Sequence, residues 1–110
     1  MSAIERQVLK NLLLQEGYVE EYGLDNTIDN LLNLDGKAAE MLKAWVNKGE
    51  KPEFDVIEGI DSRILREEFK MKEPAIILSY AMLLKDPKIN SIHLKKLLNR
   101  RLVFTPNQNG

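Results

Sequence analysis

Residues 74–85 read Pro-Ala-Ile-Ile-Leu-Ser-Tyr-Ala-Met-Leu-Leu-Lys, and this stretch decides the fold. Pro74 suits the first position of a helix, where the backbone N–H that proline lacks would have no helical partner. Asp86-Pro87 ends the helix, because proline disfavours helical backbone in the residue before it. A helix that is apolar on nearly every side is surrounded by other elements. The stretch therefore predicts a central apolar helix over about 74–85.

Apolar residues recur at helical spacing in further segments around this stretch. We expect helices over Ala3–Gln15, Thr27–Leu34, Gly36–Lys48, about 61–71 and about 90–103. The first helix should offer one apolar stripe to the core, formed by Ile4, Val8, Leu9, Leu12 and Leu13. The last helix should contribute Ile92, Leu94, Leu97, Leu98 and Leu102. Trp45 and Tyr80 lie on the apolar sides of their helices, so we expect both rings in the core.

Capping residues support these boundaries. Ser2 and Glu5 form a capping box, in which each side chain accepts a hydrogen bond from the other residue's backbone N–H. Side-chain caps for the later helices are expected from Asp25 or Asn26, from Asp35, from Asp61 or Ser62, and from Asn90 or Ser91. Gly17 and Gly49 are expected to end the first and third helices, because glycine adopts the left-handed conformation that commonly follows a helix.

The segment 50–60 is the one place where extended structure is expected. Pro52 and Gly59 argue against a long helix there, and Phe54–Ile57 fits either an extended segment or a single turn. We therefore predict an all-α fold, a single-domain irregular bundle of five or six short helices over residues 1–104. The polar residues 105–110 should form a flexible tail.

Composition limits the classes of protein that this chain can belong to. It has 110 residues, 44% hydrophobic and 30% charged, which fits one globular domain. The absence of cysteine excludes a disulfide scaffold, a thiolate zinc site and a cysteine nucleophile. No run without charge approaches the ~20 apolar residues of a membrane span. The N-terminus lacks the basic-then-apolar order of a signal peptide. A cytoplasmic protein that does not bind membranes is the default expectation.

No pattern in the sequence points to catalysis, to a metal or to a cofactor. His93 is the only histidine, and Ser91, two residues away, faces another side of the same predicted helix. The paired carboxylates Glu20–Glu21 and Glu67–Glu68 lie in charged surroundings, whereas a catalytic acid needs a desolvated pocket. Phosphate-binding glycine motifs are lacking. We therefore predict no catalytic, metal-binding or cofactor-binding residues, and a protein that is not an enzyme.

One stretch of the sequence matches part of a calcium-binding loop but departs from it at two required positions. Asp25, Thr27 and Asp29 occupy the first, third and fifth positions of an EF-hand loop. The sixth position requires glycine and holds Asn30, and the twelfth requires glutamate and holds Gly36.

Charge is divided unevenly along the chain, although the net charge is only −1. The acidic run, from Glu16 to Asp35, contains six acidic residues and no Lys or Arg. The basic run, from Pro87 to Gly110, contains five basic residues and no Asp or Glu. The two runs could pair within one chain, or each could meet a complementary surface on another molecule. Tyr18 and Tyr22 lie within the acidic run, away from any apolar stripe. Exposed tyrosine beside charge is typical of contact surfaces, and the alternative is that both rings cover the end of the bundle.

These observations favour a non-enzymatic protein–protein interaction module of the adaptor, inhibitor or antitoxin-like kind, with a foreign protein or a second copy as partner. The alternative is a nucleic-acid-binding helical domain that uses the basic C-terminal helix on phosphates. Two features argue against this alternative: the net charge of the whole chain is slightly negative, and the turn before that helix is long. The candidate partner-binding residues are Lys88, His93, Lys95, Lys96, Arg100 and Arg101 in the basic run, and Glu16, Tyr18, Glu20, Glu21 and Tyr22 in the acidic run.

Overall fold

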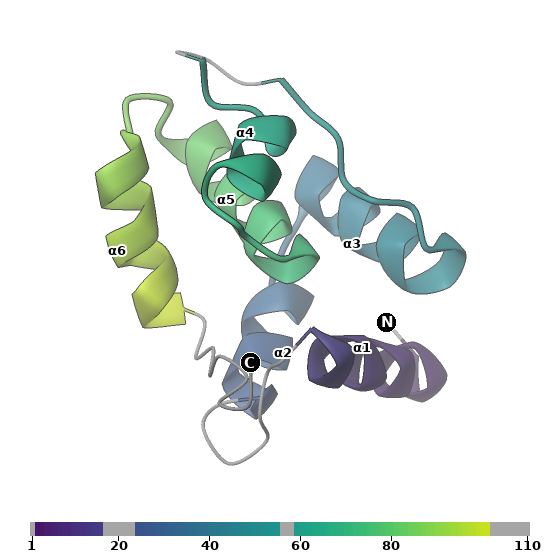
Figure 1. Cartoon of the computed structure of the whole chain (residues 1–110). Helices are drawn as coiled ribbons and strands as arrows, with labels where there is room; N and C mark the ends of the chain where they lie inside the picture. Colours follow the sequence, from purple (N-terminus) through teal and green to yellow (C-terminus); the bar gives the residue numbers. More distant parts are fainter. Residues whose placement is uncertain (1, 17–23, 56–58, 102–110) are drawn as a thin grey trace, which may run out of the picture.

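The structure is a computed structural model that describes residues 2–16, 24–55 and 59–101, with side chains described as far as Leu98. These residues form six α-helices and no strand (Figure 1). The helices are α1 (Ala3–Gln15), α2 (Leu24–Leu32), α3 (Gly36–Lys48), α4 (Ser62–Glu67), α5 (Glu73–Lys85) and α6 (Ser91–Arg101). The predicted all-α bundle of short helices is confirmed. Gly17 and the tail predicted for 105–110 lie outside the described residues.

Helix α5 is the centre of the bundle, as the sequence predicts. It contacts α3, α4 and α6, which surround it in Figure 1. Nine of its 13 residues are buried, and Ile76 and Ile77 are fully enclosed. Full burial of one such side chain stabilises the fold by about 1.5–3 kcal/mol. The helix begins at Glu73, so Pro74 occupies its second position, where a backbone N–H also has no helical partner.

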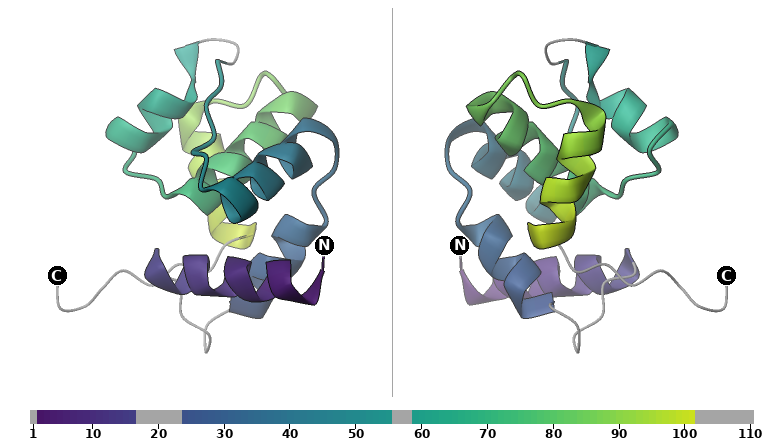
Figure 2. Two further views of the ribbon diagram at one scale, coloured as in Figure 1. Left: turned by 90° about the vertical axis from the view of Figure 1, so that its right-hand side faces the viewer. Right: turned by 90° about the vertical axis from the view of Figure 1, so that its left-hand side faces the viewer.

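Helices α1 and α2 lie together at one end of the molecule (Figure 2). The capping box is confirmed: Ser2 Oγ accepts from the Glu5 N–H at 3.1 Å, and Glu5 Oε1 accepts from the Ser2 N–H at 3.0 Å. Leu9 and Leu13 are fully buried against the rest of the bundle. The predicted apolar stripe is wider than the buried face of the helix, because the side chains of Ile4 and Val8 are exposed.

The boundaries of α2 and α3 follow burial as well as capping. Helix α2 begins at Leu24, whose side chain is fully buried, so Asp25 and Asn26 lie inside the helix and are not its caps. Helix α3 has the predicted bounds and ends at Gly49 in the left-handed conformation, with φ 68°. Asp35 precedes α3 as predicted, but its side chain accepts no capping hydrogen bond in the described structure.

The described chain between α3 and α4, up to Asp55 and again from Gly59, forms no α-helix, and Gly59 adopts the left-handed conformation with φ 78°. Asp55 and Asp61 form an isolated antiparallel bridge, and the Phe54 N–H donates to Ser62 Oγ at 3.1 Å. The remaining part of the predicted extended segment lies outside the described residues. The bridge and the hydrogen bond hold this connection against the first residue of α4.

Helix α4 is shorter than predicted. Asp61 caps it by accepting from the Ile64 N–H at 2.9 Å, but the helix ends at Glu67 and not near Met71. Lys70 then adopts a left-handed conformation with φ 55°, which turns the chain toward α5. The Met71 N–H closes this turn by donating to the Leu65 carbonyl at 3.0 Å.

Candidate interaction surface

Helix α6 has one buried side and one outward side. Asn90 caps the helix, because its Oδ1 accepts from the His93 N–H at 2.9 Å. Leu94 and Leu98 are buried, and α6 packs against α5 and α2. Successive helical residues are rotated by about 100°, so Ile92 lies well away from these two leucines. Its side chain is 69% exposed, which corrects the prediction that Ile92 belongs to the core.

Basic side chains flank Ile92. The helical rotation places Lys96, one turn further along, on the same side as Ile92, with His93 on one flank and Lys95 on the other. All three basic side chains are exposed, as is Lys88 in the turn that leads into α6. We call this set the α6 surface, formed by Lys88, Ile92, His93, Lys95 and Lys96.

One cation of the α6 surface is held in place by an aromatic ring. The Lys95 Nζ lies 4.6 Å from the centroid of the Phe69 ring, which is packed against the core between α4 and α5. A cation over a ring face is attracted by the ring quadrupole, by about 0.5–1 kcal/mol at an exposed site. The contact orients Lys95 without neutralising its charge.

The described carboxylates of the acidic run form no ion pair with the cations of this surface. Helix α2, which carries part of that run, does contact α6. Its carboxylate Asp29 Oδ1 nevertheless lies 3.6 Å from Arg6 Nη2, and Glu16 Oε2 lies 3.9 Å from Lys72 Nζ. Both pairs use cations outside the basic run. In the part of the chain that the structure describes, no carboxylate pairs with Lys88, Lys95 or Lys96.

The other predicted partner-binding residues are placed only in part. Arg100 and Arg101 belong to α6, but their side chains lie outside the described part. Four residues of the acidic run also lie outside it: Tyr18, Glu20, Glu21 and Tyr22. The described members of the predicted set are therefore brought together only on α6 and the turn before it, and Glu16 is paired with Lys72.

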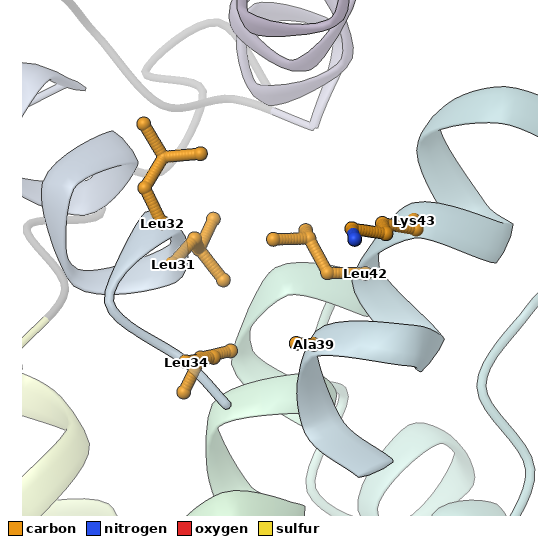
Figure 3. A pocket seen from close by; sticks show the side chains of 6 residues that line it. All are labelled: Leu31, Leu32, Leu34, Ala39, Leu42 and Lys43. Atoms are coloured by element: carbon orange, nitrogen blue, oxygen red, sulfur yellow. The ribbon is translucent and has the colours of Figure 1, made fainter. Parts of the chain in front are cut away.

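A hollow of about 270 Å³ lies between α2 and α3 (Figure 3). Leu31 and Leu42 are its buried walls, and Lys43 lies at its rim. Leu32, Leu34 and Ala39 complete the lining. The volume of this hollow is just below the ~300–1,000 Å³ of typical small-molecule sites, and such sites also bring together several polar groups. A single cation on an aliphatic wall offers no acid–base pair.

Within the described ranges, no three His, Asp or Glu side chains gather closely enough to hold a metal ion. None of the described helices combines the length and the apolar character needed to cross a bilayer. Comparison with models of known protein families, with curated proteins and with solved structures finds no match to this chain.

The sequence predicts the cations of this surface but not its apolar centre. The signal was present in the spacing of α6. Leu94 and Leu98 define the inward side, and Ile92 is rotated by about 140° from their mean direction at 100° per residue. A β-branched aliphatic residue at that angle, among lysines, indicates an exposed contact residue.

Proposed function

We propose that this chain is a non-enzymatic protein–protein interaction module that binds an acidic partner through the α6 surface. The observation that carries the proposal is the Ile92 side chain, 69% exposed and surrounded by cations that have no described carboxylate partner. Protein interfaces combine an apolar centre with a polar rim. The α6 surface has this arrangement on a small scale.

The cations of the α6 surface indicate that the partner surface is negatively charged. A group of exposed cations attracts an acidic surface and speeds its encounter, and repels a basic one. Ile92 adds a requirement that charge alone does not impose, because an aliphatic side chain gains free energy only where water is removed from both sides. The partner surface should therefore offer an apolar contact bordered by Asp or Glu. An adaptor, inhibitor or antitoxin-like protein of this kind would act by covering that surface of its partner.

The same observation argues for protein over nucleic acid. Contacts to phosphate are made by Lys, Arg, polar side chains and backbone N–H groups, and they give nucleic-acid binding most of its affinity. An exposed isoleucine at the centre of the basic face would add nothing to such contacts. The net charge of −1 also differs from the strong positive charge of most DNA-binding domains.

Capture of partners from the source cells by the full chain tests the proposal. Wild type should retain a stoichiometric acidic protein after nuclease treatment, and the Ile92→Ser variant should lose it at unchanged net charge. Lys51→Glu, at an exposed lysine outside the helices, is the matched control for Lys96→Glu and should retain the protein. Nucleic acid that is retained by Ile92→Ser, lost by Lys96→Glu and released steeply by salt would support the nucleic-acid alternative instead.

A further inference from the structure

Asp35-Gly36, at the junction of α2 and α3, is the one place in the sequence where glycine directly follows aspartate. A bond between the side-chain carboxyl carbon of an aspartate and the next backbone nitrogen closes a five-membered ring. A following glycine leaves this approach open because it has no side chain. Both residues are exposed, and nothing lies within 4 Å of the position that a Cβ of Gly36 would take.

Neither reacting group of this dipeptide is occupied in the described structure. The Asp35 carboxylate accepts no capping hydrogen bond and forms no ion pair with a described residue. The first N–H groups of a helix have no partner within the helix. The Gly36 N–H is one of these, and it donates to no acceptor among the described residues. The nitrogen and the carboxyl group are therefore both available for reaction.

Asp61, at the start of α4, is the matched case in which both groups are occupied. The two aspartates have nearly the same backbone conformation, with φ −127° and ψ 177° at Asp35 and φ −133° and ψ 173° at Asp61. The Asp61 carboxylate accepts from the Ile64 N–H at 2.9 Å. The nitrogen that follows it, in Ser62, donates to the Phe54 carbonyl at 3.0 Å. Ring closure at Asp61 would break both hydrogen bonds, whereas neither group of Asp35-Gly36 has such a bond to break.

We propose that Asp35-Gly36 is a site of spontaneous backbone isomerisation in the folded protein. The Gly36 nitrogen attacks Cγ of the protonated Asp35 carboxyl group, the N–Cγ bond forms, and the C–OH bond breaks. The hydroxyl group leaves as water with the amide proton. A second water molecule then opens the cyclic imide. Cleavage of the N–Cγ bond returns aspartate, and cleavage of the bond from the nitrogen to the main-chain carbonyl carbon gives isoaspartate. The sequence of steps needs no reactant other than water.

Isoaspartate would change the junction between α2 and α3. The main chain would then run through the former side chain of Asp35, which adds one methylene group to the backbone. The former main-chain carbonyl, which accepts from the Ala39 N–H at 3.3 Å, would become a free carboxylate. Only residues 33–35 separate the two helices, and the helices are in contact. The longer connection should therefore disturb this contact and lower the stability of the fold.

Storage of the native full chain in water enriched in the heavy isotope of oxygen tests the proposal. Each opening of the imide adds one heavy oxygen atom to the residue, and mass spectrometry of proteolytic fragments locates this atom. Asp35 should be labelled at least about ten times faster than Asp61, because the two hydrogen bonds that must break at Asp61 raise its barrier by enough for that factor. Asn109-Gly110 can cyclise in the same way with loss of ammonia, and its labelling is the positive control for the assay.

Labelling in urea separates the effect of the fold from that of the sequence, because serine follows Asp61 and glycine follows Asp35. Unfolding should speed the labelling of Asp61 strongly and that of Asp35 only slightly. A labelling rate at Asp35 that rises on unfolding as steeply as the rate at Asp61 would overturn the proposal. Equal rates at the two residues in the native chain would do the same.

Asp35→Ser is the control for the effect on stability, since serine is equally preferred before a helix and has no carboxyl group that can cyclise. Gly36 is left unchanged, because its φ of 56° favours glycine. Stored wild type should accumulate isoaspartate at position 35 and melt at a lower temperature than fresh wild type, whereas Asp35→Ser should not change on storage. Isoaspartate without a change in melting temperature would overturn the predicted effect on the junction, and absence of isoaspartate at position 35 would overturn the proposal.

Discussion

Arg66 of α4 and Glu73 of α5 are joined by two parallel hydrogen bonds. Arg66 Nε donates to Glu73 Oε1 at 3.2 Å, and Nη2 donates to Oε2 at 2.9 Å. Nη2 also donates to the carbonyl of Pro52 at 3.0 Å, so one guanidinium holds three segments of the chain together. The hydrogen bond to Glu73 is the main cause that raises the pKa of Arg66 above its ordinary value, against the effect of burial.

Removal of the Glu73 carboxylate should therefore destabilise the fold. The side chains of Arg66 and Glu73 are 25% and 11% exposed, so the remaining guanidinium would be left largely desolvated without its partner. Breaking a fully buried pair costs about 3–5 kcal/mol, and the partial exposure here lowers our expectation for Glu73→Ala to about 2–3 kcal/mol. Urea unfolding measures this loss.

Glu67→Ala is the control, because Glu67 is an exposed carboxylate at the end of α4. Its free energy of unfolding should stay within about 0.5 kcal/mol of that of the wild type. Because the raised pKa belongs to a cation, the stabilisation is present below the ordinary pKa of arginine and is lost only as pH rises above it. The difference between wild type and Glu73→Ala should not change over the neutral range. A Glu73→Ala midpoint equal to that of Glu67→Ala would contradict the assigned role.

A charge in the middle of α5 should unfold the protein or come close to doing so. Ile77 is fully buried, and an aspartate at that position would have to be protonated or left without solvent, at a cost of several kcal/mol. Leu84→Asp places the same group on the same helix at a residue that is 52% exposed, and we expect a change below about 1 kcal/mol there. Melting curves by circular dichroism separate the two variants. Equal melting temperatures would show that α5 is not the core.

Glu5 should make stability depend on pH. Its pKa is lowered, first by the hydrogen bond from the Ser2 backbone, then by those from the side chains of Asn47 and Ser2. A carboxylate with a lowered pKa stabilises the fold above its unfolded pKa, and this contribution is lost as pH falls through its folded pKa. Urea midpoints of wild type and Glu5→Gln should therefore differ at pH 7 and converge in acid, below the pKa of Glu5. A constant difference at both pH values would mean that the charge of Glu5 contributes nothing.

Local signals predicted the elements whose ends depend on neighbouring residues in the sequence. Ser2 and Glu5 fix the start of α1, and Gly49 fixes the end of α3. Lys70 shows where such signals fail. Lys70 adopts the left-handed conformation although it is not a glycine. The chain turns there between Arg66 and Glu73, whose ion pair is a tertiary contact that no local signal predicts. The early start of α2 has a similar cause, because burial of Leu24 extends the helix beyond its expected cap.

The exposed apolar residues were predicted less well than the fold, for one shared reason. Helical spacing groups Ile4 and Ile92 with other apolar residues of their helices, but it does not show which side of a helix meets another helix. Tertiary packing buries Leu9 and Leu94 and leaves both isoleucines in solvent. The cations of α6 were predicted from charge alone, since Lys and Arg remain exposed unless they are paired.

The central claim is that Ile92 is the apolar centre of a surface that binds an acidic protein. The most direct measurement is the dissociation constant of the purified partner for wild type, Ile92→Ser and Lys96→Glu at two salt concentrations. We predict that Ile92→Ser weakens binding by about 5- to 30-fold, through faster dissociation and almost equally at both concentrations, as for a desolvated contact. Lys96→Glu should mainly slow association, and more at low salt. Binding by Ile92→Ser that equals that of wild type at both salt concentrations would contradict the claim.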